Sequence, residues 1–225
     1  MKHIKLEKNG YKAYIIVDKQ EKLNAFDTAM YKDVGKCLDD VAQDPDIRVV
    51  ILKGAGRAFS AGYDVEEEAA RIGYMEELAE IEDYCNSNRW KIWNMRKPVI
   101  AQIHGYCLGG ACELVLPCDY VLSSDDCKVG EPEITFGAMT AYNIMPWLVP
   151  MRQAKALMLT GEKITGKRAA EIGLVTASYP ADQLEQEVEA LADKLIRIAP
   201  PVLCLQKKML NRTYEIMGMQ GAIDW

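Results

Sequence analysis

Residues 99–116, VIAQIHGYCLGGACELVL, place an apolar strand, a glycine-rich turn and a short helix in immediate succession. Residues 99–103 are almost continuously apolar, which is typical of a buried strand. A helix is predicted from Gly109 to Leu116, because Pro117 follows it and cannot continue the hydrogen-bond pattern. A second apolar strand leads into a second glycine turn within residues 49–64, VVILKGAGRAFSAGYD. Strands and helices that alternate in this way favour an α/β domain.

The rest of the chain continues the alternation. A β-hairpin is predicted around Asn9-Gly10, since this dipeptide supplies the positive φ angles of a tight turn. Asp27 is a candidate N-cap for the helix that follows it. Further helical patterns occupy residues 65–96, 152–159, 165–173, 182–198 and 202–216, and further strands occupy 120–122 and 175–179. No linker is obvious, and the softest boundary is expected near Pro200, where an all-helical tail begins.

Composition limits the class of protein. The 225 residues carry a formal net charge of −6, and 49% are hydrophobic, which is enough for one substantial core. The acidic balance argues against nucleic acid as a partner, since phosphate binding needs clustered basic residues. The seven cysteines are scattered, and with two histidines they form no zinc-binding pattern. The cysteines are therefore expected to be buried, reduced thiols. We expect a cytoplasmic protein without a membrane segment, because no apolar run is long enough to cross a bilayer.

Two carboxylates accompany the glycine turns. Glu113 follows Gly110 by three residues, so both can face the same way on the first helical turn. Glu133 follows Pro132 at a predicted loop or helix start. Exposed N–H groups at a glycine turn can hold negative charge on an oxygen, and acids beside that oxygen can move protons. The combination predicts an enzyme that forms and protonates an enolate.

Each of these residues also has a structural interpretation. The glycines can serve tight strand–helix packing alone, and Glu113 can be a capping acid or a satisfied ion pair. Glu131 is expected to be a solvated turn acid. A Ser/His/Asp triad is disfavoured, because Ser60 lacks the leading glycine of a nucleophile elbow. A lone His104 at a strand end is more often a hydrogen-bonded structural residue.

The motifs, taken in order, resemble those of the crotonase superfamily, also called the enoyl-CoA hydratase/isomerase family. The resemblance covers nearly the whole chain and rests on residues 22–26, 58–64, 104–113, 132–134, 160–161 and 170–175. It implies an α/β fold, a crotonase-like spiral of ββα repeats over residues 1–199. It also implies a C-terminal helical region used in trimer formation, of which residues 200–225 would be an incomplete start. The implied assembly is a homo-trimer or a dimer of trimers.

The resemblance also implies a chemistry and a set of site residues. The substrate would be an acyl-CoA thioester, with coenzyme A entering as part of the substrate and no separate cofactor or metal. The backbone N–H groups of Tyr63 and Gly110 would form the oxyanion hole, and Glu113 and Glu133 would be the catalytic pair. Because both glutamate positions are occupied, the resemblance favours an enoyl-CoA hydratase. Residues implied along the substrate path are Lys22, Leu23, Ala25, Ala61 and Asp64.

One departure from the family pattern affects the acyl pocket. Residues 136–146 replace the Gly-Gly stretch that many hydratases carry after the second glutamate. Tyr142 within this segment can line the acyl pocket or belong to the core. Another lyase, isomerase or hydrolase acting on an aromatic or alicyclic acyl-CoA is therefore an alternative. A non-catalytic RNA-binding member is a third possibility, disfavoured by the acidic total and the two retained glutamates.

Overall fold

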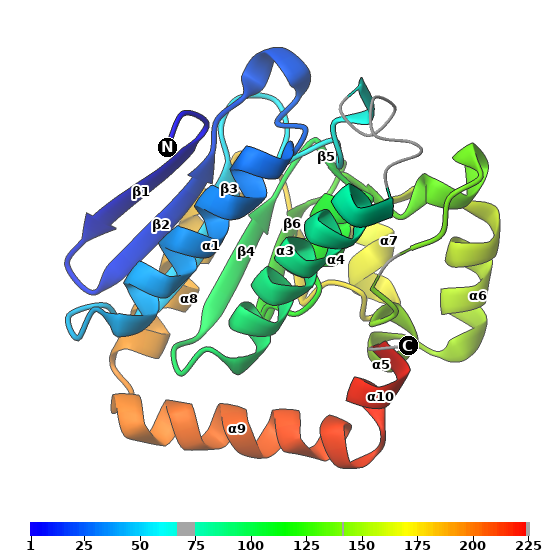
Figure 1. Ribbon diagram of the computed structural model, residues 1–225. Coiled ribbons are helices and arrows are strands. Elements are labelled where there is room, and N and C mark those ends of the chain that lie inside the picture. The colour runs from blue at the N-terminus through cyan, green and yellow to red at the C-terminus, as the bar shows by residue number, and fades with distance from the viewer. Residues whose placement is uncertain (67–74, 141, 224–225) are drawn as a thin grey trace.

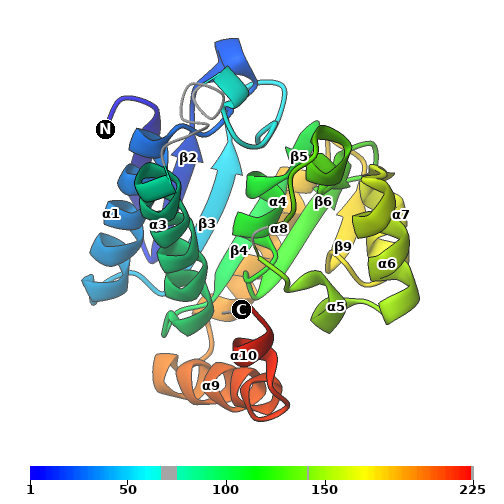
Figure 2. The same cartoon turned by 45° about the vertical axis from the view of Figure 1, so that its right-hand side comes forward.

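The computed structural model describes residues 1–66, 75–140 and 142–223, with backbone only for residues 75–82. Its main sheet has six strands in the order β1-β2-β3-β4-β6-β9 (Figures 1 and 2). The predicted hairpin is present as β1 and β2, and the remaining strands run parallel to β2. The strands are β1 (Ile4–Asn9), β2 (Lys12–Val17), β3 (Val49–Gly54), β4 (Val99–Ile103), β6 (Tyr120–Ser124) and β9 (Ala177–Tyr179).

A second, three-stranded sheet consists of β5 (Tyr106–Leu108), β7 (Lys128–Gly130) and β8 (Ile164–Thr165). Strand β7 pairs in parallel with β5 and antiparallel with β8. The sequence patterns above predict none of these strands, because segments of two or three residues are too short to show an alternation. This small sheet fixes the position of the chain on both sides of the second glycine turn.

Helices cover both faces of the main sheet (Figures 1 and 2). On one face α1 (Thr28–Gln43) packs against α3 (Met75–Asn94), and α3 packs against α4 (Gly110–Val115). On the other face α8 (Leu184–Ile196) lies across β3, β4 and β6. Further helices in the described part of the chain are η1 (Gln20–Lys22), η2 (Pro132–Phe136), α5 (Met145–Leu148), α6 (Met151–Thr160), α7 (Gly166–Glu171), α9 (Pro200–Ile216) and α10 (Met219–Ile223).

The predicted helix starts have the expected chemistry. The Asp27 carboxylate accepts a hydrogen bond of 2.9 Å from the Met30 N–H and caps α1. Thr165 caps α7 in the same way, through the Arg168 N–H at 3.1 Å. The predicted helix in residues 65–96 is observed from Met75 onward, and its residues 67–74 lie outside the described part of the chain. The last two helices form the C-terminal helical region that the resemblance implies.

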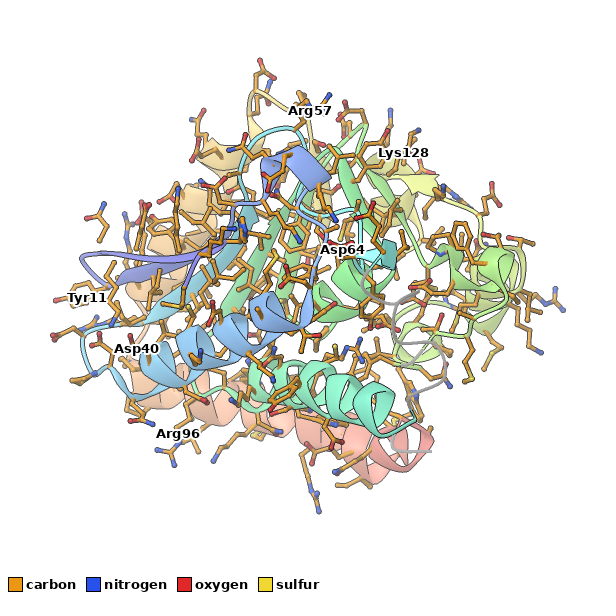
Figure 3. The ribbon with its side chains drawn as sticks, turned by 45° about the horizontal axis from the view of Figure 1, so that its top comes forward. Tyr11, Asp40, Arg57, Asp64, Arg96 and Lys128 are labelled. Carbon is orange, nitrogen blue, oxygen red and sulfur yellow. The ribbon has the colours of Figure 1, made fainter. Side chains whose placement is uncertain are left out.

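The segments that follow β2, β3 and β4 leave the sheet at the same end, the carboxyl end of the strands, because these strands are parallel. They comprise residues 18–27, 55–64 and 104–110 and therefore contain most of the predicted site residues. Asp64, at the end of the second of these loops, is labelled in Figure 3. Within the described ranges, no helix is long and apolar enough to cross a membrane.

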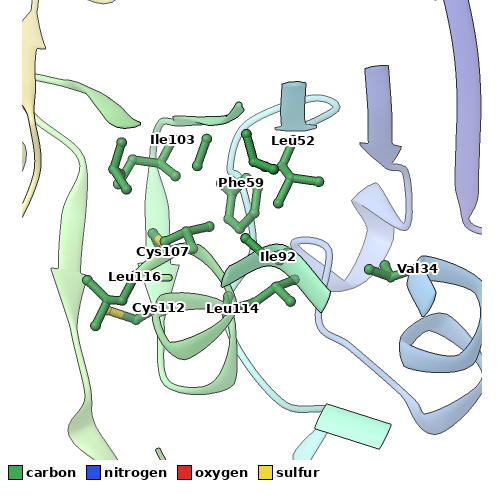
Figure 4. Packing of buried hydrophobic residues seen from close by; sticks show 14 of the residues in the cluster. Val34, Leu52, Phe59, Ile92, Ile103, Cys107, Cys112, Leu114 and Leu116 are labelled. Carbon is green, nitrogen blue, oxygen red and sulfur yellow. The ribbon is translucent and has the colours of Figure 1, made fainter. Parts of the chain in front are cut away.

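The main core lies between the sheet and the layer formed by α1, α3 and α4 (Figure 4). Phe59, at the start of the first glycine turn, is completely buried there. Leu114 and Ile92 bring α4 and α3 into the same cluster. The seven cysteines are free thiols, and five of them are buried, as their apolar neighbours predicted. The first glycine turn and α4 are therefore anchored in a packed hydrophobic core.

Candidate active site

The two glycine turns lie side by side. Leu108 N donates to Ser60 O at 3.3 Å, and Ser60 and Cys107 form an isolated parallel bridge. Gly62 has a φ of +105°, and a Cβ at this position would lie 2.7 Å from Leu108 O. A side chain at Gly62 would therefore be strained and would push the two turns apart.

Gly109 and Gly110 are required by what packs on them. Gly109 has a φ of +53°, and a Cβ there would lie 2.4 Å from Glu133 Oε1. A Cβ on Gly110 would lie 2.4 Å from Cζ of the Tyr63 ring. The structural interpretation expected strand–helix packing, but the nearest groups to these two glycines are side chains. The groups packed against them, however, are two of the predicted site residues.

The two N–H groups predicted to form an oxyanion hole belong to these turns. Phe26 N donates to Gly62 O, and Asp64 N donates to Phe26 O, both at 2.8 Å, so the backbone on both sides of Tyr63 is fixed. Gly110 is the first residue of α4, and an N–H in the first turn has no intrahelical acceptor. Among the described residues, neither Tyr63 N nor Gly110 N donates to a backbone carbonyl. Both groups have the character that the prediction requires.

Glu113 projects from α4 into a fully enclosed cluster, with 0% of its surface exposed. Its Oε2 forms an ion pair with the Arg89 guanidinium and accepts a hydrogen bond of 2.8 Å from the Tyr63 hydroxyl. Its Oε1 accepts a hydrogen bond of 3.1 Å from Tyr142 N. Of the interpretations left open by the sequence, the satisfied ion pair is therefore the observed one. An ion-paired carboxylate beside the glycine turn is compatible with a chemical role as well.

Arg89 connects Glu113 and Tyr63 with a third side chain, Asn86. Arg89 comes from α3, and its own side chain is 0% exposed. Its Nη2 donates to the Tyr63 hydroxyl at 2.9 Å as well as to Glu113, and its Nη1 donates to Asn86 Oδ1 at 2.9 Å. Sequence reasoning missed Arg89. The signal was its place four residues after Cys85 and three before Ile92, on the apolar face of the helix.

The Tyr63 side chain was also missed from the sequence, because only the Tyr63 backbone N–H was predicted to take part in the site. The phenol lies between Gly110, Glu113 and Arg89, and its ring centroid is 5.8 Å from that of Tyr31. Burial, and then the negative charge of Glu113, raise the pKa of Tyr63 well above its ordinary value. The hydroxyl is therefore a hydrogen-bond donor throughout the physiological pH range.

Glu133 stands on η2, directly after Pro132, as predicted. Both of its carboxylate oxygens are inaccessible to solvent, and Oε1 lies against Gly109. Glu113 and Glu133 thus flank the Gly109-Gly110 turn, one from the helix that begins there and one from the segment that packs on it.

The expectation for Glu131 is wrong. This residue is 2% exposed, although a solvated turn acid was predicted. Burial, and then the neighbouring carboxylates of Glu113 and Glu133, raise its pKa well above the ordinary value. It lies between the end of β7 and the start of η2, and β7 itself was not predicted.

The predicted substrate-path residues come together in the first two loops. Ala61 N donates to Leu23 O at 2.9 Å, which joins the loop after β2 to the first glycine turn. Ala25 is buried, and Lys22 is partly exposed at the rim of this junction. Asp64 is paired with Lys22 at 3.0 Å.

The same junction is stabilised by buried polar groups. The Asn24 side chain donates to Ala55 O and Ala58 O, at 2.9 and 2.8 Å. Asp64 also accepts a bond of 3.0 Å from Lys19, which in turn contacts Asp27. The two loops therefore form one connected unit.

Tyr142 is a core residue, since its side chain is completely buried. Its ring packs edge-on to Trp90, with 6.1 Å between centroids, and the Arg89 guanidinium lies 5.1 Å from its centre. Its contribution to the site is the backbone N–H that binds Glu113. His104 and Ser60 have local structural bonds, to Gly56 O at 3.0 Å and from Gly62 N at 3.1 Å, in keeping with the rejection of a triad.

The sequence profile of the enoyl-CoA hydratase/isomerase family matches residues 7–224. The chain belongs to this family. It is 30% identical to the short-chain-enoyl-CoA hydratase of Clostridium acetobutylicum over 100% of the chain and 85% of that protein. It is 31% identical to the hydroxycinnamoyl-CoA hydratase-lyase of Pseudomonas fluorescens over 98% of the chain and 82% of that protein.

Solved structures identify the fold. An enoyl-CoA hydratase/isomerase from Xanthobacter autotrophicus Py2 superimposes with a TM-score of 0.95 at 34% sequence identity. The match covers 99% of this chain and 83% of that structure. The crotonase-like α/β fold implied by the sequence motifs is therefore confirmed.

Proposed function

We propose that the chain is an enoyl-CoA hydratase, which adds water across the 2,3 double bond of an acyl-CoA thioester. Family membership supports an enzyme of this class, and a relative that is 30% identical to the chain is named as a hydratase. The observation that carries the proposal is the placement of Glu113 and Glu133 on either side of the Gly109-Gly110 turn. The Tyr63 turn lies against this turn and supplies the second N–H group.

The reaction follows from this arrangement. The thioester oxygen accepts hydrogen bonds from Tyr63 N and Gly110 N, so the negative charge of the enolate is stabilised as it develops. Water forms a bond to the β carbon and gives one proton to a glutamate, while the other glutamate gives a proton to the α carbon. The pi bond between the α and β carbons is consumed, and one proton passes in net from one carboxyl to the other.

The substrate path is assigned to the connected loops. Lys22, Leu23 and Ala25 would contact the coenzyme A portion, with Ala61 and Asp64 beside the thioester. Coenzyme A belongs to the substrate, and the residues around the glutamates require no separate cofactor in this reaction. The proposed site of action is the cytoplasm.

An aromatic acyl-CoA is the second candidate substrate. A relative at 31% identity is named as a hydroxycinnamoyl-CoA hydratase-lyase. Phe26, Tyr31 and Tyr63 form a row of rings at Gly110, with centroids 4.8 and 5.8 Å apart, and such a row can pack against a planar acyl group.

A panel of thioesters tests both candidates. The purified protein is incubated with straight-chain 2-enoyl-CoAs, cinnamoyl-CoAs and cyclic enoyl-CoAs, and products are identified by mass. A gain of one water supports the hydratase proposal, and a preferred cinnamoyl substrate supports the second candidate. Failure to bind or convert any thioester, together with salt-dependent retention of RNA, would replace both with the non-catalytic alternative.

The proposed assembly is a homo-trimer or a dimer of trimers. Helix α9 exposes a set of large apolar residues, namely Val202, Leu205, Met209, Leu210 and Ile216. An exposed apolar surface of this kind marks an interaction site. Sedimentation equilibrium measures the mass directly, and a monomer at all concentrations would reject the proposal.

A further inference from the structure

Arg89 is an enclosed cation to which the proposed reaction gives no step. It reaches Glu113 across the contact between α3 and α4, which lie side by side (Figures 1 and 2). Both members of this ion pair have side chains that are almost completely enclosed. Replacing a buried ion pair by apolar residues is often neutral or stabilising, so stability alone gives little reason for Arg89 at this position.

Arg89, Glu113 and the Tyr63 hydroxyl form a closed triangle of contacts. Arg89 Nη2 contacts Glu113 Oε2 and also donates to the Tyr63 hydroxyl at 2.9 Å. The Tyr63 hydroxyl donates its proton to the same Glu113 Oε2 at 2.8 Å. Because each group contacts the other two, none of them can turn away without breaking contacts of both others.

The guanidinium is fixed on its other side as well. Its Nη1 donates to Asn86 Oδ1 at 2.9 Å, and its central carbon lies 5.1 Å from the centre of the Tyr142 ring. Tyr142 N donates to Glu113 Oε1 at 3.1 Å, so Tyr142 contacts both members of the ion pair. A planar guanidinium carries its donors in a rigid fork, and one such side chain can therefore orient several acceptors at once.

The triangle connects the Glu113 carboxylate to both glycine turns. Glu113 lies on the helix that Gly110 begins, and Tyr63 belongs to the first glycine turn. The Tyr63 ring packs directly on Gly110, since a Cβ there would lie 2.4 Å from Tyr63 Cζ. The two residues whose N–H groups are proposed to bind the thioester oxygen are thus held in relation to Glu113. A misplacement of about 1 Å in such a site costs a reaction roughly a hundredfold in rate.

We propose that Arg89 is a positioning residue, which holds the Glu113 carboxylate and the Tyr63 turn in a fixed relation through its contacts with both side chains. This inference rests on the proposed hydratase function. It gives Arg89 no contact with the substrate. Loss of the fork should therefore slow the reaction of bound substrate, whereas binding of the coenzyme A portion by the loops after β2 and β3 should remain.

The kinetic test uses Arg89→Lys, which keeps a positive charge in the enclosed site but cannot reproduce the fork. On the 2-enoyl-CoA that wild type hydrates fastest, we expect kcat to fall roughly 10- to 100-fold and KM to stay within about twofold. The matched control is Arg168→Lys on α7, where the arginine is exposed and paired with Glu171 at 3.1 Å. The control should match wild type in both constants.

A purely structural role of Arg89 gives a different result. The folded fraction of each variant is measured by circular dichroism at the assay temperature, and kcat is expressed per folded molecule. If Arg89 only stabilises the fold, Arg89→Lys will have the wild-type kcat per folded molecule, and the proposal is rejected. A raised KM at an unchanged kcat also rejects it, because that result assigns Arg89 to substrate binding.

A second variant, Tyr63→Phe, tests the triangle without changing a buried charge. It removes the hydroxyl and keeps the ring on Gly110, and we expect kcat to fall roughly tenfold, the equivalent of one hydrogen bond to a charged group. Combined with Arg89→Lys it should add little further loss, because both changes break the same set of contacts. Multiplied losses would reject the triangle. Should Arg89→Lys fail to fold, an unchanged kcat in Tyr63→Phe rejects it as well.

The outcomes separate this inference from the proposed function. If wild type is a hydratase and Arg89→Lys matches it, the role of Arg89 is rejected and the hydratase proposal stands. If wild type hydrates no thioester, the hydratase proposal fails, and hydrogen exchange at the α carbon of butanoyl-CoA in D2O replaces the assay. In this exchange a base of the site takes the α proton and the carbon regains a deuteron, which mass spectrometry detects. Slower exchange in Arg89→Lys then supports the positioning role, and absence of exchange in wild type rejects it.

Discussion

Asp64 and Glu131 both expose little surface, 7% and 2%, but Glu131 lies deeper in the protein, and folding shifts their pKa values in opposite directions. Burial opposes the ionisation of Asp64, but hydrogen bonds from Lys22 and Lys19 prevail and lower its pKa. Burial also acts on Glu131, where its nearest charged neighbours include two carboxylates, and the pKa is raised. The comparison shows that the depth of burial and the charged partners of an acid together set the direction of its pKa shift.

The two regions correspondingly have different uses. In the Asp64 region, ion pairs of Asp64 with Lys19 and Lys22 connect the loop after β2 to the first glycine turn. The Glu131 region contains a deeply buried carboxyl group whose pKa is raised. An ionised acid surrounded by lysines is suited to structure, whereas an acid that is easily protonated is suited to proton transfer.

Replacing Glu133 by Gln gives the largest expected effect on the reaction. The variant keeps the volume of the side chain but cannot move a proton, so the hydration rate should fall by about 10²- to 10⁴-fold. Its thermal midpoint should stay near wild type, because the shape of the side chain against Gly109 is preserved. Steady-state assays on a responsive enoyl-CoA and a melting curve measure both. Retention of wild-type turnover would remove Glu133 from the chemistry.

Removing the buried cation should have the largest effect on stability. Arg89→Met takes away the guanidinium that is ion-paired with the enclosed Glu113, and we expect a loss of about 3–5 kcal/mol in the free energy of unfolding. For the same reason Glu113→Gln is a less clean kinetic variant than Glu133→Gln, since it removes the carboxylate that Arg89 pairs with. Urea denaturation at an unchanged m-value measures the loss.

A double variant distinguishes a charge effect from a packing effect. If the ion pair is responsible, Arg89→Met combined with Glu113→Gln should recover part of the stability that either change removes alone. Strictly additive losses would show that Arg89 acts through packing of its side chain against Tyr142 instead.

The sequence predicts the parts of this comparison that depend on local patterns. The hairpin, α1, α4 and α8 follow from turn residues, caps and apolar periodicity, and the family motifs identify the glycine turns. The burial of Glu131 could not be predicted, because it depends on β7 and on the packing of η2 against α6, which bring together distant segments. Arg89 was equally hidden, since only the folded chain shows which acid it meets.

The contribution of Asp64 to stability should change at acidic pH. Its pKa is lowered by folding, so its contribution to stability is complete above the unfolded value of about 3.8 and is lost as pH falls through the folded value. We expect Asp64→Asn to destabilise the protein by about 1 kcal/mol at neutral pH, and by progressively less below about pH 4. Melting curves across this range measure the difference. A constant difference at all pH values would mean that Asp64 contributes through shape rather than charge.

Replacing either of the two lysines that pair with Asp64 should have the smallest effects on stability. These variants show which of the two ion pairs of Asp64 stabilises the protein. Lys19 has a side chain that is 9% exposed and contacts both Asp64 and Asp27, whereas the Lys22 side chain is 39% exposed and contacts Asp64 and Glu66. Solvent screens the outer pair, so Lys19→Met should cost about 1 kcal/mol and Lys22→Met should leave the melting midpoint unchanged. Raising the salt concentration should weaken the Lys22 contact first. Equal losses for the two variants would show that the pairing of Asp64 depends on the net positive charge at the loop junction. The difference between the pKa shifts of Asp64 and Glu131 would then reflect the total charge around each acid rather than individual buried partners.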